Sequence, residues 1–163
     1  MTIPATLITE KQLEAHAPEL LKTIGLRRLD RELQIGSYKL DAVALDEKTR
    51  RVVVVELKTC AHIGSLGQLL LYRSALRKTL ATTALKSYEI DALLITTFLD
   101  LEVVSVVNDL GLSDSIHVKV CVGDLAPFSL VDPYDAPANQ AWYQRSVKVS
   151  PRLDDRIKGW EFP

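Results

Sequence analysis

Two carboxylates and one amine are spaced in this chain so that a fold could gather them at one point. Asp41 precedes the sequence Glu56-Leu57-Lys58 by fifteen residues. Neighbouring carboxylates repel each other unless a cation lies between them, and hard oxygen ligands favour Mg²⁺ or Mn²⁺ over softer metals. Such an ion would polarise a phosphoryl oxygen and acidify a bound water, while Lys58 could orient that water or offset charge in the transition state. The pattern indicates metal-assisted cleavage of a phosphodiester bond.

The convergence of these groups depends on a hairpin. Residues 38–46 and 51–58 are strand-like runs rich in Val, and the polar residues 47–50 suit a four-residue loop. This loop length places Asp41 directly opposite Glu56 on one face of the sheet, and a slip of one residue would turn Asp41 away. An exposed acid and a Glu-Lys pair at a strand end are the commoner explanation of such a pattern. Here, however, Glu56 follows four consecutive valines, and a charged residue directly after a buried apolar run usually has a functional role.

A helix is predicted directly after these strands. From Ser65 the sequence carries leucines at helical spacing, and Gln68 and Tyr72 lie one turn apart on a second stripe. These two side chains would therefore project side by side. They could serve the site, or the segment could be an ordinary amphipathic helix in which Tyr72 is half-buried.

The order and spacing of these residues resemble the PD-(D/E)xK nuclease superfamily. The likeness is closest to the branch with a Gln-x-x-x-Tyr helix, which RecB-type nucleases and the nuclease domain of NucS mismatch endonucleases share. The matching segments are Gly36–Asp41, Val52–Lys58 and Gly67–Tyr72, and Leu40 stands where the family often has proline. With the opening helix and the later strands, the resemblance covers residues 9–123.

The resemblance implies an α/β, restriction-endonuclease-like core with a central four-stranded mixed sheet flanked by helices. It also implies that Asp41 and Glu56 bind Mg²⁺ or Mn²⁺ together with the backbone carbonyl of Leu57, and that Lys58 is the catalytic lysine. The residues expected to support the site or the DNA are Gln68 and Tyr72.

Family members also commonly carry an acid on the first helix that reaches the metal ion through water. Thr9 and Gln12 predict a capping box at the start of that helix. Glu14 is the predicted water-mediated ligand, although a solvated helix acid explains it equally well. Pro18 is expected to kink or restart the helix, and Gly25 to end it.

The rest of the chain predicts an α/β sandwich. Residues 88–97 and 117–122 read as strands, and residues 101–110 read as a helix. The domain is expected over residues 1–123, and the proline-rich residues 124–163 are expected to be an extension that packs on the domain or on a partner.

Composition favours a compact cytoplasmic protein. The chain has 163 residues, of which 47% are hydrophobic, and the sequence shows no repeat, signal peptide or membrane-spanning run. Cys60 and Cys121 are too few for a disulfide framework, so reduced thiols are expected.

The charge balance does not by itself favour nucleic-acid binding. With 20 basic and 21 acidic residues the formal charge is −1, whereas proteins that grip long duplexes usually have a basic surplus. A local basic rim could compensate, although a solvated charged face is the commoner explanation. The residues of this predicted DNA-binding rim are Arg73, Arg77 and Lys78, together with Arg27 and Arg28.

Three functions are consistent with these features. The leading hypothesis is a metal-dependent DNA nuclease of repair, recombination or defence that works as a homodimer or with a targeting partner. The second is a catalytically weak or inactive binding or assembly module with the same fold. The third is a nuclease that acts on RNA.

Overall fold

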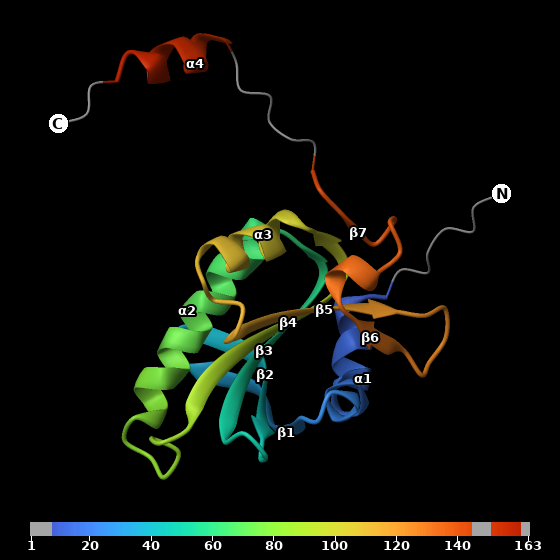
Figure 1. The fold of residues 1–163 in the computed structure, drawn as a ribbon. Coiled ribbons are helices and arrows are strands. Elements are labelled where there is room, and N and C mark those ends of the chain that lie inside the picture. The colour runs from blue at the N-terminus through green and yellow to red at the C-terminus, as the bar shows by residue number, and fades with distance from the viewer. Residues whose placement is uncertain (1–7, 145–150, 161–163) are drawn as a thin grey trace.

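One mixed β-sheet with helices on both faces forms the fold (Figure 1). The computed structural model describes residues 8–144 and 151–160. In chain order the elements are α1 (Glu10–Thr23), β1 (Arg27–Ile35), β2 (Tyr38–Asp46), β3 (Arg51–Ala61), α2 (Ile63–Leu80), β4 (Glu89–Asp100), α3 (Glu102–Asp109), β5 (Ile116–Val122), β6 (Ser129–Val131), a 3₁₀ turn (Pro133–Asp135), β7 (Ala141–Trp142) and α4 (Pro151–Lys158).

The sheet has seven strands, and its main path runs in the order β1-β2-β3-β4-β5-β6. Strands β1, β2 and β3 are antiparallel neighbours, β3, β4 and β5 are parallel, and β6 returns antiparallel to β5. Strand β7 pairs in parallel with the end of β4. The four predicted strands are β2, β3, β4 and β5, and the chain adds β1 at one edge and the short β6 and β7 at the other side.

Alternation along β3 divides the core into two layers. Val53, Val55 and Leu57 pack with α1, whereas Val52 and Val54 pack with α2 and α3. Because β3 is buried on both faces, its side chains form a nearly continuous hydrophobic run. Glu56 interrupts this run, and by alternation with Val52 and Val54 it lies on the face that α2 covers.

Both ends of α1 are fixed by local sequence. The Thr9 hydroxyl accepts a hydrogen bond from the Gln12 N–H at 3.2 Å, and the Gln12 side chain accepts one from the Thr9 N–H at 2.9 Å, so the predicted capping box is confirmed. Gly25 ends the helix with a φ of 79°, which a residue without Cβ adopts without strain. Pro18 does not restart the helix, which runs on through it as one element, and the alternative expectation of a kink there stays a prediction. Burial of apolar residues on both sides of Pro18 holds the helix on the sheet, and these residues are Leu13, Ala17, Leu20 and Leu21.

The later elements agree with the sequence prediction within a few residues. Strand β4, helix α3 and strand β5 lie where the periodicity placed them. Cys60 and Cys121 are both free thiols. Within the described residues, no helix is both long and apolar enough to cross a bilayer.

Candidate active site

Strands β2 and β3 separate at the point where the predicted acids lie. Their paired residues run from Asp46 and Arg51 to Ala42 and Val55, which is the predicted register. The pairing stops there, so Asp41 and Glu56 are not a ladder pair as predicted, although their carboxyl groups lie close enough for Asp41 to raise the pKa of Glu56. The Asp41 carboxylate instead accepts a hydrogen bond from the Leu57 N–H at 2.8 Å, and this bond satisfies a backbone donor that the ladder no longer pairs.

The alternation of side chains along β2 breaks at Asp41. Val43 and Leu40 both belong to the core layer beneath α2, while Ala42 belongs to the layer beneath α1. Strict alternation would put Leu40 with Ala42, so the strand changes its phase at Asp41. As a result Asp41 and Ala42 line the same cleft on the α1 side.

Glu56 is almost completely buried, with 3% of its side chain exposed. Its Oε1 lies 3.2 Å from the Lys58 Nζ. Its Oε2 is buried and has no hydrogen-bond partner among the residues that the structure describes. An unsatisfied buried carboxylate oxygen is costly, so this atom is suited to a ligand that the protein alone does not supply.

The electrostatics of the site disfavour two ionised acids in the metal-free protein. Burial and the nearby Asp41 charge raise the pKa of Glu56 from 4.5 to about 7. Burial also raises the pKa of Asp41, although the Leu57 N–H and Lys58 oppose this effect. Burial lowers the pKa of Lys58, but the hydrogen bond and charge of Glu56 outweigh it and leave the pKa above its ordinary value. Lys58 is therefore a cation at neutral pH.

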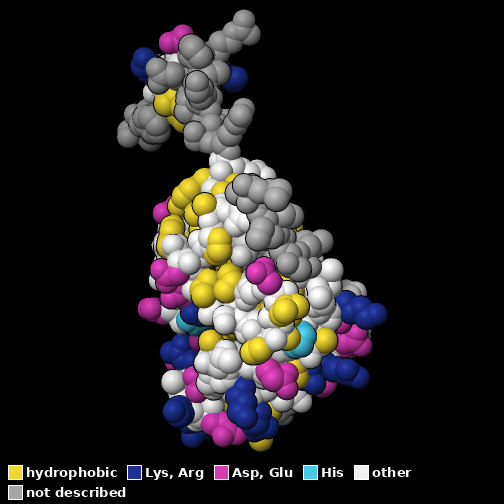
Figure 2. Space-filling model, turned by 90° about the vertical axis from the view of Figure 1, so that its right-hand side faces the viewer, with side chains coloured by type: hydrophobic (Ala, Val, Ile, Leu, Met, Phe, Trp, Pro, Cys, Tyr) yellow, Lys and Arg dark blue, Asp and Glu magenta, His cyan; other side chains and the backbone are white. Residues whose placement is uncertain are grey.

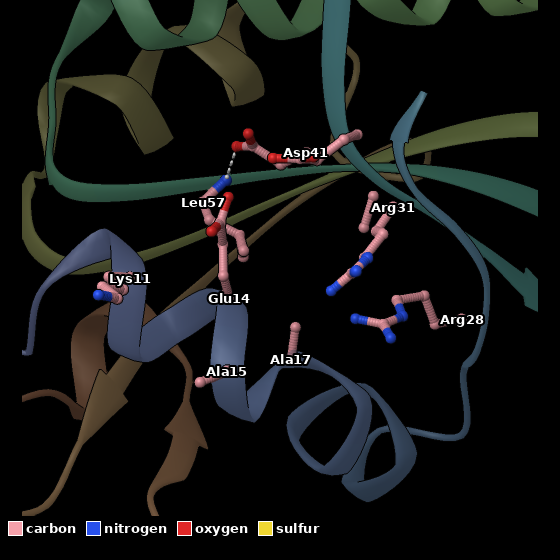
Figure 3. Close-up of a pocket in the computed structure, with 10 residues that line it drawn as sticks. Lys11, Glu14, Ala15, Ala17, Arg28, Arg31, Asp41 and Leu57 are labelled. Carbon is pink, nitrogen blue, oxygen red and sulfur yellow. Dashed lines mark hydrogen bonds between the residues drawn. The ribbon is translucent and has the colours of Figure 1, made fainter. Parts of the chain in front are cut away.

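A cleft of about 280 Å³ opens beside Asp41, between α1 and β1 (Figure 3). The α1 residue Glu14 lines this cleft together with Asp41 and Leu57. Glu14 and Glu10 both raise the pKa of Asp41 by their charge. The Glu10 N–H donates to the Thr59 hydroxyl at 3.1 Å, which ties the start of α1 to the end of β3.

The donor set fits a hard divalent cation. Asp41 and Glu56 supply carboxylate oxygens, and among the described residues the Glu56 Oε2 has no hydrogen-bond partner. In a β-strand the N–H and carbonyl of one residue point toward the same neighbour, so the Leu57 carbonyl shares the side of the Leu57 N–H that bonds Asp41. No group of three or more His, Cys, Asp and Glu side chains within residues 8–144 and 151–160 is arranged to hold a metal. An ion here would thus need the backbone carbonyl and water as further ligands.

Gln68 and Tyr72 contact each other on α2, as the helical spacing predicted. The Gln68 Nε2 donates to the Tyr72 hydroxyl at 2.6 Å. Tyr72 is buried in the core, with 7% exposed, and its ring lies 5.8 Å from that of Tyr38. Tyr72 is thus part of the packing beneath α2, the face of the sheet on which Glu56 lies.

The part of the predicted basic rim that lies on α2 is away from the acids. The Arg73 Nε donates to the Ile90 carbonyl at 2.7 Å, and Arg73 and Arg77 line a different cleft together with Arg51. Arg51 begins β3, whereas Glu56 lies five residues further along the strand. The arginines of α2 lie near Arg51 because α2 runs back along the sheet toward the start of β4. DNA binding by Arg73, Arg77 and Lys78 stays a prediction without a geometric link to the acids.

Other basic residues do line the cleft beside Asp41. They are Lys11 from α1 and Arg28 and Arg31 from β1 (Figure 3). Only Arg28 was considered from the sequence, since β1 was not predicted as a strand. Figure 2 shows that basic and acidic side chains are interspersed over the face that α1 and β6 form, so no large field of one sign is present there.

Comparison with known proteins identifies the fold. No protein-family model and no curated protein matches this sequence. A repair endonuclease from Pyrococcus abyssi aligns with 69% of this chain and 46% of its own, with 17% identity and a TM-score of 0.53. The structure of the EndoMS-dsDNA2 complex aligns with 72% of this chain and 46% of its own, with 20% identity and a TM-score of 0.54.

This chain therefore spans less than half the length of either solved protein. At these identities the likeness concerns the fold and not the activity. The mixed sheet flanked by helices is that of both solved proteins, so the α/β, restriction-endonuclease-like fold predicted from the sequence is confirmed.

Proposed function

We propose that this chain is an Mg²⁺- or Mn²⁺-dependent nuclease that hydrolyses phosphodiester bonds of DNA in repair, recombination or defence. The observation that carries this proposal is the buried, unpartnered Oε2 of Glu56 next to Asp41. The fold supports it, since two repair-related endonuclease structures share the sheet on which these acids lie.

The residues that would hold the cation are Asp41, Glu56 and the carbonyl of Leu57, with Glu14 acting through water. When bound, the cation supplies a Lewis acid for a phosphoryl oxygen and lowers the pKa of a water ligand. Both acids then stay ionised, because the positive charge offsets the burial and the neighbouring negative charges that raise their pKa values without it.

Lys58 is proposed to act as a cation and not as a base. Its pKa is above the ordinary value, so it keeps its proton at neutral pH. Its Nζ lies 3.2 Å from Glu56 Oε1, and it can donate a further hydrogen bond to the attacking water or to a phosphoryl oxygen. Charge that develops on the phosphate in the transition state would be stabilised by this ammonium group.

DNA is proposed as the substrate because the EndoMS structure contains double-stranded DNA on the same fold. The solved endonucleases are more than twice as long as the part this chain matches. A second copy of the chain or a partner protein would supply the additional contact area.

Plasmid nicking tests the proposal. Purified chain should relax supercoiled plasmid in Mg²⁺ or Mn²⁺ but not in a chelator, and Asp41→Asn or Glu56→Gln should abolish the activity. Glu47→Gln is the matched control, because Glu47 lies in the hairpin loop with 66% of its side chain exposed. RNA of the same sequence is digested in parallel. Preferential cleavage of RNA would show that RNA, and not DNA, is the substrate. Cleavage of neither nucleic acid would favour a binding module with a nuclease fold.

A further inference from the structure

A β-bulge in β1 brings Arg28 and Arg31 to one face of the sheet. Residues three apart on a regular strand point to opposite faces. Here the register shifts between Arg28 and Asp30, so Arg28 pairs with Ala44 and Arg31 pairs with Ala42. Both alanines belong to the core layer beneath α1. The extra residue in the bulge thus gives the two arginines the same orientation.

Both side chains reach into the cleft beside Asp41. Figure 3 shows the two guanidinium groups pointing from β1 into the space between β1 and α1. Arg28 is half-buried and Arg31 is exposed. Asp41 and Leu57 line the same cleft, so the arginines share it with the proposed metal ligands.

Neither arginine side chain has an ion-pair partner within residues 8–144 and 151–160, in contrast to other cations of the same edge. Arg27 pairs with Glu47 at 2.7 Å, and Lys39 pairs with Glu32 at 3.2 Å. Of the acids that line the cleft, Glu32 is therefore already paired, Asp41 is a proposed metal ligand, and Glu14 remains.

Two guanidinium groups that point into one cleft, with no ion-pair partner in the part of the chain that the structure describes, are suited to an anion with several oxygens. A guanidinium donates paired hydrogen bonds that match the geometry of a phosphate. The cleft of about 280 Å³ is lined mostly by charged side chains, whereas pockets for organic ligands are lined predominantly by apolar ones. A phosphate group of a nucleic-acid backbone fits such a lining better than an apolar organic molecule does.

We propose that Arg28 and Arg31 together bind one backbone phosphate of the strand that is cut, next to the scissile phosphate. This proposal rests on the proposed nuclease function, since the scissile phosphate would lie at the adjacent acids Asp41 and Glu56. The arginines position the strand and carry no sequence preference, because a phosphate is the same beside every base.

Binding of a fluorescein-labelled DNA duplex, followed by anisotropy in Ca²⁺ over a range of salt concentrations, tests this site. The Arg28→Gln, Arg31→Gln double variant should bind about 10- to 100-fold more weakly, the effect of losing charge-assisted hydrogen bonds. The slope of log affinity against log salt should fall in magnitude by about 0.9, the value for one phosphate of B-DNA. The loss should be equal for duplexes of different sequence.

Lys48→Gln is the matched control, because Lys48 is an exposed cation of the loop between β2 and β3 and does not line the cleft. It should keep wild-type affinity, and thermal melting should show that all variants fold. Double-variant affinity equal to that of wild type, in a chain that still nicks plasmid, would overturn the phosphate site alone. A slope change near twice the one-phosphate value would show two separate phosphates and also overturn it. A wild type that neither binds nor nicks DNA would refute the nuclease function, and the site with it.

Discussion

Asp41 accepts a hydrogen bond of 2.8 Å from the backbone N–H of Leu57, the residue between Glu56 and Lys58. This bond is made just beyond the last paired residues of β2 and β3, where the strands separate. It holds the Asp41 carboxylate at the backbone of β3 without a metal ion. The two acids are therefore placed close enough for the Asp41 charge to raise the pKa of Glu56 before any cation binds.

Metal binding should depend on both acids. Wild type is expected to bind Mn²⁺ in titration calorimetry and to melt at a higher temperature in its presence, because a ligand that binds only the folded state stabilises it. The Asp41→Ala, Glu56→Ala double variant should show neither effect. Equal Mn²⁺ binding by wild type and the double variant would show that the ion binds elsewhere.

The metal-free protein should lose stability as pH rises. The folded-state pKa of Glu56 is about 7, raised from 4.5, so the folded state holds a proton where the unfolded chain has lost it. The free energy of unfolding therefore falls with rising pH between these two values and levels off above the higher one. The raised pKa of Asp41 acts in the same direction. Urea unfolding at a series of pH values in a chelator measures the effect.

Glu56→Gln is the control for this pH dependence. The amide has nearly the same shape but does not ionise, so the fall of stability between the two pKa values should be smaller than in wild type. Above the folded-state pKa the variant should be the more stable protein. In wild type, Mn²⁺ affinity should rise through the same pH window, because the ion requires the ionised carboxylates. Wild-type stability that rises with pH relative to the variant would contradict the assignment.

Local signals in the sequence were sufficient for the hairpin and for α1. Loop length and the run of valines fix the register of β2 on β3, and Thr9 and Gln12 fix the start of α1, because each depends on residues close in sequence. The phase change at Asp41 was not predictable. It arises where the ladder ends, and the competing partner of the carboxylate is a backbone N–H that carries no sequence signal.

Strand β1 was missed for a different reason. As an edge strand with mostly exposed side chains, it has no apolar alternation to identify it. The bulge after Arg28 further disrupts the period. The cleft side chains of β1, Arg31 above all, could therefore not be placed from the sequence. Arg73 was misplaced because the direction of α2 along the sheet follows from the parallel pairing of β3 and β4, which is a property of topology.

Lys58→Ala should reduce DNA cleavage by a factor on the order of 100 or more. The ammonium group is lost from the position where it can stabilise charge on the phosphate, while both acids remain. Mn²⁺ binding measured by calorimetry, and DNA binding measured by anisotropy in Ca²⁺, should stay close to wild type. Lys58→Arg keeps the charge and should recover part of the activity. Retained cleavage with weakened DNA binding would identify Lys58 as a residue that positions phosphate.

Substitutions of Gln68 and Tyr72 should have different effects, because Gln68 is expected to support cleavage and Tyr72 to stabilise the core. Tyr72→Ala is expected to lower the free energy of unfolding by about 3 kcal/mol, because a buried aromatic ring leaves a cavity. Gln68→Ala loses only the hydrogen bond to the Tyr72 hydroxyl, so its melting temperature should change little while cleavage falls.

Tyr72→Phe is the control that isolates this hydrogen bond, since it keeps the ring and removes the hydroxyl. If the bond matters because it orients Gln68 toward the site, Tyr72→Phe and Gln68→Ala should each reduce cleavage, and the double variant should be no worse than the more damaging single one. Plasmid nicking rates and urea unfolding on the same preparations measure both properties. A large loss of stability in Gln68→Ala with cleavage that falls only in proportion would assign the pair to packing alone.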